Sequence, residues 1–303
     1  MRNHAGVTSH SLGAHMEAEL TSQPDTWRQA ARLAETAPLP QRGQRVVVLG
    51  CGTSWFMAQS YATMREQAGH GLTDAFAASE APLERDYDLA ILLSRSGTTT
   101  EVMAAARSLR GRVPLLGIVG DPDTPLPTLV DDVVVLDFAD EASVVQTRFA
   151  TTALTLLRAG LGIDVTASIA DAEAALAAPI DARLVTADQI TFLGSGWAVG
   201  LAHEAALKNR EASQSWTESY PAMEYRHGPI AVAAPGRATW VLGAAPDGLG
   251  DDVAATGATY VEHAEVDPLA ELVATQRVAL ERARARDLDP DHPRALSRSV
   301  ILG

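Results

Sequence analysis

The sequence predicts an α/β protein made of two copies of a doubly wound parallel-sheet domain. Two stretches, 46–53 and 190–197, are similar: each is an apolar run that ends in Leu-Gly-x-Gly and precedes a helix-compatible segment. Continuous apolar runs that alternate with helical segments are typical of a parallel sheet buried on both faces. We therefore expect one such domain in each half of the chain.

The order of the expected elements divides the chain into an N-terminal helical segment, two domains and an extended tail that closes over the site. These parts span residues 1–40, 41–162, 163–287 and 288–303. Strands are expected near 45–49, 73–77, 88–93, 113–119 and 132–136, then near 189–193, 238–243 and 258–262. Helices are expected near 13–36, 54–68, 100–110, 145–160, 168–178, 197–212, 247–256 and 267–283. Ligands in open α/β sheets bind beyond the carboxyl ends of the strands, so the loops after 45–49 and 88–93 can share one pocket.

Composition limits the classes of function. The chain has 303 residues and is 47% hydrophobic, which is enough for a sizeable core and two domains. A net charge of −14 argues against binding nucleic acid or an anionic membrane through a basic surface, although a few local donors can still hold an anionic small molecule. One cysteine, no signal-like N-terminus and no membrane-length apolar run predict a cytoplasmic protein without membrane association.

A short polar loop, Ser94-Arg95-Ser96-Gly97-Thr98-Thr99, joins the apolar run 89–93 to the helical segment 100–109. The first N–H groups of a helix have no partner within it, and the helix dipole is positive at that end. Hydroxyl groups add neutral donors, and Gly97 allows a tight turn. The pattern predicts a phosphate-binding loop; an ordinary strand-to-helix turn with Ser/Thr capping is the plainer alternative.

Other chemistry-bearing motifs are absent from the sequence. Gly50 and Gly52 begin a Gly-x-Gly pattern, but Trp55 stands where a dinucleotide fingerprint needs its third glycine. There is no P-loop lysine, no His/Cys cluster and no Gly-x-Ser-x-Gly elbow. We therefore expect no metal, and the sequence supports neither a dinucleotide-binding protein nor a serine hydrolase.

The expected helix 197–212 carries three charged residues on one face, Glu204, Lys208 and Glu211. A Glu-rich segment that ends at His227, before Gly-Pro, follows it. Together these groups offer a base, a charge stabiliser and a second proton carrier. The alternatives are a solvated Glu–Lys face and an ordinary loop histidine.

Five motifs in order resemble the sugar isomerase (SIS) family, and within it the isomerase half of glutamine–fructose-6-phosphate amidotransferase. They are Cys51-Gly52-Thr53-Ser54, the 94–99 loop, 204–211, 224–229 and the tail 291–300. The resemblance implies two SIS domains, each with a five-stranded parallel sheet. It also implies a sugar-phosphate ligand, no cofactor, and a homodimer with the site at the subunit interface.

The resemblance also implies roles for individual residues. Glu211 would move a proton between C1 and C2, His227 would assist ring opening from the neighbouring subunit, and Lys208 and Glu204 would position hydroxyls. The phosphate would be held by Ser94, Arg95, Ser96, Thr99, Thr53 and Ser54. Cys51, Gly52 and Arg298 would be further substrate-binding residues.

Three departures from the family pattern narrow the expected reaction. The family loop usually carries Gln where Arg95 stands; an Arg could strengthen a phosphate contact. The tail Lys that forms an imine with the sugar is Arg298 here, and a guanidinium cannot form that imine. The sequence also lacks the N-terminal glutaminase domain and its cysteine, since it begins Met1-Arg2-Asn3, so we expect no glutaminase activity.

Hexosamine-phosphate deamination, fructosamine-phosphate deglycation and simple phosphosugar isomerisation remain open. We favour an amine-releasing reaction, because the substrate then brings its own nitrogen. SIS domains also serve as sugar-phosphate sensors in transcription regulators, so a non-catalytic binding protein is the alternative. Glu211 together with His227 favours the enzyme, because a pure sensor requires neither.

Overall fold

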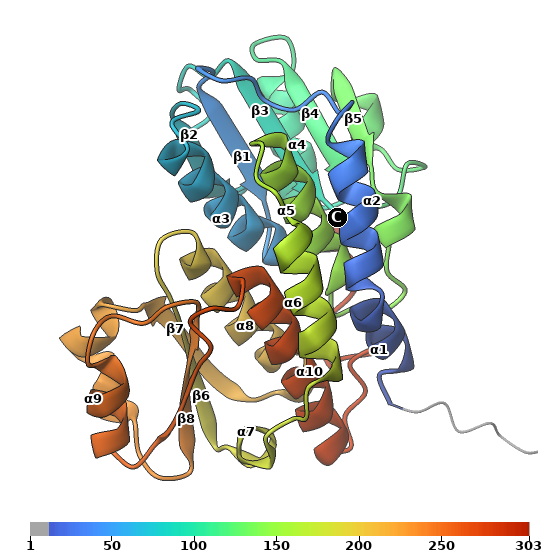
Figure 1. Cartoon of the computed structure of the whole chain (residues 1–303). Coiled ribbons are helices and arrows are strands. Elements are labelled where there is room, and N and C mark those ends of the chain that lie inside the picture. Colours follow the sequence, from blue (N-terminus) through green and yellow to red (C-terminus); the bar gives the residue numbers. More distant parts are fainter. Residues whose placement is uncertain (1–11, 303) are drawn as a thin grey trace, which may run out of the picture.

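The computed structural model describes residues 12–302, which form two parallel sheets flanked by helices, one sheet in each half of the chain (Figure 1). This confirms the predicted α/β class. The first sheet has the strand order β2-β1-β3-β4-β5. Its strands are β1 (Val46–Gly50), β2 (Thr73–Ala77), β3 (Leu89–Ser94), β4 (Leu115–Val119) and β5 (Asp132–Val135), where the sequence predicted them.

Helices cover both faces of the first sheet, which explains its continuous apolar strands. Val46 and Val48 pack into the core shared with α3 (Thr53–Gln67) and α5 (Arg148–Gly160). Val47 and Leu49 point the other way, into the core beneath α4 (Thr100–Leu109). Since successive strand residues face opposite sides, a strand buried on both sides needs apolar residues throughout.

The second sheet has four strands in the described chain, so the expectation of five strands is wrong for this half. The order is β7-β6-β8-β9, which repeats the order of the first sheet without its fifth strand. The strands are β6 (Gln189–Gly194), β7 (Trp216–Pro221), β8 (Arg237–Leu242) and β9 (Thr259–Glu262). Only residues 263–267 separate β9 from α10 (Pro268–Ala285), and a parallel crossover needs about a dozen residues or more.

The remaining helices largely follow the predicted positions. The N-terminal helix is divided at Ser22 into α1 (Ala14–Thr21) and α2 (Gln23–Leu33), with Pro24 in the first turn of α2. Proline lacks the N–H that would continue the preceding helix. The second half contains α6 (Thr166–Ala177), α7 (Ala182–Thr186), α8 (Ala198–Ser213), α9 (Leu249–Ala255) and α10.

The repeated Leu-Gly-x-Gly segments build the same turn in both halves. β1 ends at Gly50 and β6 at Gly194, and each strand is followed by a glycine with positive φ, 53° at Gly52 and 56° at Gly196. A Cβ atom on Gly194 would lie 2.2 Å from the carbonyl oxygen of Ala198, and one on Gly50 would also clash with its helix. The glycines therefore let each helix begin directly against its strand.

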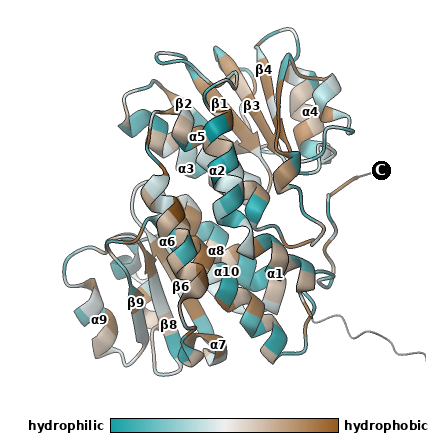
Figure 2. Ribbon diagram, turned by 45° about the vertical axis from the view of Figure 1, so that its right-hand side comes forward, coloured by the Kyte–Doolittle hydropathy of each residue, from teal (hydrophilic) through white to brown (hydrophobic). Residues whose placement is uncertain are grey.

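The two halves share one hydrophobic core, which lies between the sheets and the central helices (Figure 2). Helix α8 crosses α3 closely at Gly200. A Cβ atom at this position would lie only 2.4 Å from the carbonyl oxygen of Phe56, so a glycine is needed there. A buried ion pair between Arg158 of α5 and Asp267, at the start of α10, spans 2.6 Å. These contacts fix the second half against helices α3 and α5 of the first half.

After α10 the described tail forms neither helix nor strand and runs back across the molecule to α4, as the sequence predicted for an extended segment. Near its start, the Asp291 carboxylate accepts the backbone N–H groups of His15 and Met16, each at 2.9 Å. These groups belong to the first turn of α1, so the tail is anchored to an otherwise unsatisfied helix end.

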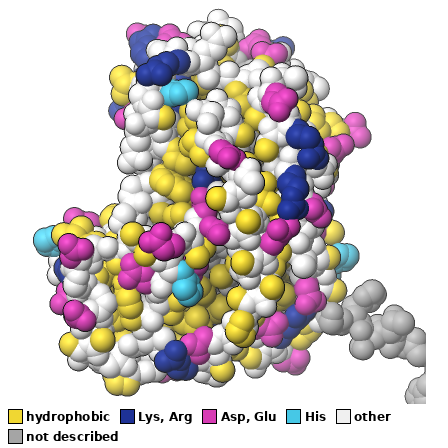
Figure 3. Space-filling model, in the orientation of Figure 1, with side chains coloured by type: hydrophobic (Ala, Val, Ile, Leu, Met, Phe, Trp, Pro, Cys, Tyr) yellow, Lys and Arg dark blue, Asp and Glu magenta, His cyan; other side chains and the backbone are white. Residues whose placement is uncertain are grey.

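The surface shows no large basic patch on the face in Figure 3, where acidic and basic side chains are scattered over both halves. Within residues 12–302, no helix combines the length and apolar character needed to cross a bilayer.

We expect Gly194→Ala to lower the free energy of unfolding by about 3 kcal/mol, because the new methyl group overlaps the first turn of α8. Gly111→Ala is the control: Gly111 has a φ of 78° but open space around it, so only about 1 kcal/mol of backbone strain is expected. Denaturant unfolding measures both. Equal losses would show that the close strand–helix approach is not the constraint.

Candidate active site

The polar loop between β3 and α4 is a cluster of hydroxyl groups at a helix N-terminus. The hydroxyls of Ser96 and Thr99 lie 3.4 Å apart, and Ser94 Oγ accepts the Gly97 N–H at 3.2 Å. Gly97 has a φ of 59°, and a Cβ atom there would lie 2.1 Å from Thr124 Oγ1. Glycine is therefore required for this loop to fold against its neighbour.

The C-terminal tail lies directly on this hydroxyl loop, a contact that the sequence did not predict in detail. Ser299 Oγ accepts from Thr98 Oγ1 at 2.9 Å and from Ser96 Oγ at 3.2 Å, and it lies 3.5 Å from Thr99 Oγ1. The N–H of Thr100, the first residue of α4, donates to the Val300 carbonyl at 3.1 Å. Two oxygen atoms of the tail thus face the donors of the loop.

Arg95 does not direct its guanidinium to the hydroxyl loop, contrary to the expected phosphate contact. It is buried and donates to the carbonyl oxygens of Ser143 and Arg298, each at 2.9 Å. The Glu141 carboxylate lies 4.0 Å from it. Since these partners occupy the guanidinium, Arg95 supports the tail and the loop that contains Ser143.

Arg298, which stands where the family has its imine-forming lysine, makes an ion pair with Asp140. Its Nη2 lies 2.6 and 2.7 Å from the two carboxylate oxygens, and its Nη1 donates to the Glu141 carbonyl. The side chain is therefore engaged in holding the tail, and its backbone carbonyl is held in turn by Arg95.

The turn between β1 and α3 lies beside the hydroxyl loop, because β1 and β3 are adjacent parallel strands. Thr53 and Ser54, in the first turn of α3, are buried. Burial, helped by the charge of Glu101, raises the pKa of the Cys51 thiol to about 11. Cys51 therefore stays protonated at neutral pH and offers at most a weak donor.

The expected charged face of α8 is a buried cluster, so the solvated alternative is wrong for two of its three members. Lys208 Nζ lies 3.5 Å from Glu204 Oε1 and is hydrogen-bonded to Glu211 Oε2. The side chains of Glu204 and Lys208 are each 1% exposed, whereas Glu211 is 21% exposed. Glu211 is thus the member of the cluster that solvent can reach.

Burial and the charges of neighbouring groups together shift the pKa values in this cluster. Burial raises the pKa of Glu204 to about 8; the charge of Glu211 acts in the same direction, and Lys208 and the Thr53 hydroxyl oppose it. For Lys208 burial acts downward, but the neighbouring carboxylates outweigh it and raise the pKa. At neutral pH the ammonium therefore faces one neutral carboxyl and pairs with Glu211.

The cluster and the turn at the end of β1 meet because α8 lies over the beginning of α3. Thr53 faces Glu204, and a Cβ atom on Gly52 would lie 3.9 Å from Leu207 of α8. The charge of Glu141, which lies beside Arg95, also acts on Lys208. The hydroxyl loop, the β1–α3 turn and the α8 cluster therefore converge at the carboxyl edge of the first sheet.

His227 is not brought to this cluster within one chain. It ends the short 3₁₀ helix η3 (Glu224–His227) and is exposed, and its side chain has no hydrogen-bond partner among residues 12–302. The same described part contains no group of three or more His, Cys, Asp or Glu side chains placed to hold a metal ion.

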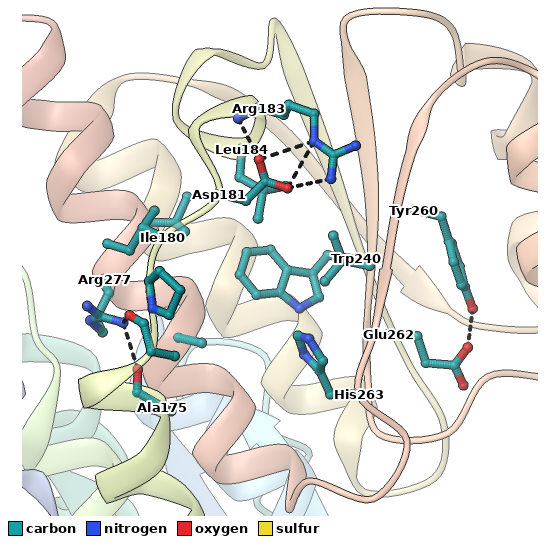
Figure 4. Close-up of a pocket in the computed structure, with 15 residues that line it drawn as sticks. Ala175, Ile180, Asp181, Arg183, Leu184, Trp240, Tyr260, Glu262, His263 and Arg277 are labelled. Carbon is teal, nitrogen blue, oxygen red and sulfur yellow. Dashed lines mark hydrogen bonds and ion pairs between the residues drawn. The ribbon is translucent and has the colours of Figure 1, made fainter.

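A cavity of about 450 Å³ lies elsewhere, on the second half of the chain (Figure 4). Trp240, Tyr260 and His263 line one part of it, and Ile180 and Leu184 another. Neither the hydroxyl loop nor the α8 cluster contributes to its lining, so this cavity is separate from the candidate active site.

Comparison with known proteins identifies the class. Residues 40–159 match the SIS domain family, and the whole structure has the fold of phosphosugar isomerases. The structure of Thermotoga maritima glucosamine-6-phosphate deaminase is similar with a TM-score of 0.79 and 25% identity, covering 94% of this chain and 99% of that one. The Escherichia coli tagatose-6-phosphate ketose/aldose isomerase matches with a TM-score of 0.75 and 18% identity, covering 96% of each chain. The latter establishes the fold alone.

More particularly, the chain is homologous to the isomerase part of glutamine–fructose-6-phosphate aminotransferase. It is 27% identical to the Synechocystis enzyme over 86% of this chain and 51% of that protein, so it spans about half the length of such relatives. The C-terminal domain of the Francisella tularensis glucosamine-fructose-6-phosphate aminotransferase has a TM-score of 0.76 and 20% identity, covering 96% of this chain and 100% of that domain.

Because of Glu204, we expect the free energy of unfolding to depend on pH and to decrease as pH rises. The folded protein keeps the Glu204 proton up to about pH 8, whereas the unfolded chain releases it at about pH 4 to 5. The free energy of unfolding should therefore fall as pH rises through this window. Glu204→Gln should remove most of that slope.

The matched control is Glu265→Gln, because Glu265 is exposed. The free energy of unfolding of this variant should change with pH as it does in the wild type. Denaturant unfolding at a series of pH values measures all three proteins. A Glu204→Gln profile parallel to the wild type would show that Glu204 is ionised throughout.

Proposed function

We propose that the protein is a phosphosugar isomerase that acts on an amino-hexose 6-phosphate by aldose–ketose proton transfer coupled to amine release. The observation that carries this proposal is the convergence of a hydroxyl loop at a helix N-terminus with the buried Glu204–Lys208–Glu211 cluster. Similarity to glucosamine-6-phosphate deaminase supports the choice of substrate class.

In the proposed organisation, residues 41–162 form one SIS domain and 163–287 a second one that lacks the last strand. The equal strand order of the two sheets supports this division. Residues 1–40 form a helical support and 288–303 a tail; residues 1–11 and 303 lie outside the described structure. The active unit is a homodimer in the cytoplasm, in which the exposed His227 serves the neighbouring subunit's site.

The phosphate binds at the N-terminus of α4. Hydroxyls at a helix end suit a phosphate, because they donate hydrogen bonds without adding charge and the dipole favours the anion. Ser96 and Thr99 are the main donors, with Ser94 beside them. Thr53 and Ser54 add hydroxyls from the neighbouring turn, at the first turn of α3.

Glu211 is the base that removes the proton from one of the carbons C1 and C2 and returns it to the other. A second proton moves in the same direction between the heteroatoms bonded to these two carbons, so the net change is a shift of two hydrogens and no electron donor or acceptor is needed. Lys208 stabilises the negative charge that develops on oxygen, and the neutral Glu204 can donate to a hydroxyl. His227 assists ring opening.

Amine release follows from the nitrogen that the substrate carries. Water adds to the carbon that bears nitrogen, and ammonia leaves as the ketose forms. Arg298 takes no covalent part, because it remains protonated and is paired with Asp140. The proposed reaction therefore needs no imine between the protein and the sugar, and it needs no glutamine.

The direct test is a panel of hexose, hexosamine and fructosamine 6-phosphates, scored for released ammonia, ketose and C–H exchange in deuterated water. We expect ammonia and ketose in equal amounts from one amine-bearing substrate. Isomerisation of a plain hexose phosphate alone would contradict amine release. Binding without any exchange would identify a sugar-phosphate binding protein instead.

Glu211→Gln should lower C–H exchange by roughly 100- to 10,000-fold, because the amide cannot accept the proton. Sugar-phosphate binding, measured by calorimetry, should remain largely unchanged. Glu265→Gln, at an exposed position, is the control and should keep wild-type exchange. If Glu211→Gln retains near-wild-type exchange, another group is the base.

Ser96→Ala and Thr99→Ala should each weaken sugar-phosphate binding by about 1 kcal/mol, the usual net contribution of one hydrogen bond. Thr128→Ala removes an exposed hydroxyl away from the loop and should leave binding unchanged. Calorimetry with fructose 6-phosphate measures the three variants. Unchanged affinity in both loop variants would place the phosphate elsewhere.

A further inference from the structure

We propose that the C-terminal tip, Ser299 and Val300, is an internal competitor that occupies the phosphate cradle and must be displaced by the sugar phosphate. The cradle is the set of donors formed by the hydroxyls of Ser96, Thr98 and Thr99 and the N–H of Thr100. This inference rests on the proposed phosphate site and concerns its regulation.

The tip places acceptor oxygens where an anion would place its own. Ser299 Oγ accepts from Thr98 at 2.9 Å and from Ser96 at 3.2 Å. The Val300 carbonyl accepts the Thr100 N–H at 3.1 Å. A phosphate needs the same donors, and one donor hydrogen cannot serve the tip and the phosphate at full strength, so the two states exclude each other.

The tip is held weakly enough to be displaced. Both of its oxygens are neutral, whereas hydrogen bonds to a charged phosphate are about twice as strong. Its apolar side chains add little, because Val300 is 52% exposed, Ile301 69% and Leu302 64%. Polar contacts with the cradle and with Thr100 Oγ1, which accepts the Leu302 N–H, therefore provide most of the attachment.

The tip remains close to the cradle after it leaves. The preceding residue, Arg298, is tied to Asp140 through its side chain and to Arg95 through its carbonyl. Asp291 anchors the start of the tail on α1. A tether this short gives the tip a high effective concentration, so it can return whenever the cradle is empty.

The competition should appear as a lower apparent affinity, because only the fraction of molecules with an open cradle can bind. Two variants test it: Ser299→Ala, and a chain that ends at Arg298. We expect both to bind inorganic phosphate and fructose 6-phosphate roughly 3- to 30-fold more tightly than the full chain by calorimetry. Ile301→Ala, at an exposed side chain of the same segment, should bind as the wild type does.

A second measurement follows the tip itself. Carboxypeptidase should trim the C-terminal residues of the full chain faster when inorganic phosphate is present, because phosphate releases the tip. Weaker phosphate binding in both variants, together with slower trimming, would overturn the inference and make the tip a strap that closes over the ligand.

The outcomes separate this inference from the proposed function. Phosphate binding that is equal in the full chain and in both tip variants overturns the competitor alone. Tighter binding in the variants without turnover on any sugar phosphate supports the competitor and contradicts the enzyme. If no variant binds phosphate or fructose 6-phosphate, both proposals fail.

Discussion

The close crossing of α8 over α3 is the constraint on which the candidate active site depends. Gly200 has no side chain, so α8 can contact the backbone of Phe56 directly. At this short distance the residues that follow along α8, Glu204 and Lys208, are buried against the beginning of α3. A larger residue at 200 would separate the helices and open the cluster to water. The chemistry of the second half thus depends on its packing against the first.

Burial makes the two carboxyl groups of the cluster, Glu204 and Glu211, chemically different. Glu204 and Glu211 have the same side chain and share one ammonium, yet the pKa of Glu204 is raised to about 8, whereas Glu211 is partly open to solvent. In our proposal the buried acid donates a proton and the accessible one accepts it. The difference comes from depth in the fold, because desolvation penalises the charged form more strongly than a shared cation can compensate.

The sequence predicted the class of fold, nearly all of the strands and the charged face of α8, because these depend on local periodicity. It missed β7, whose residues Trp216–Pro221 form an edge strand without a continuous apolar run. It also assigned Arg95 to the phosphate, since composition cannot show where a long side chain points. The contact of Ser299 with the hydroxyl loop joins residues about two hundred positions apart and leaves no local pattern.

In the described part of the chain, the second sheet has one strand fewer than the first, so the two halves of the chain are unequal in size. A fifth strand would lie beyond β9, at the end of the sheet farthest from the strand pair β6 and β7 that flanks α8. Removing an end strand breaks no pairing among those that remain. The second half can therefore be smaller at its outer margin while the helix that carries the ionisable cluster keeps its place. Strand β9 is only four residues long and leaves little edge for unwanted association.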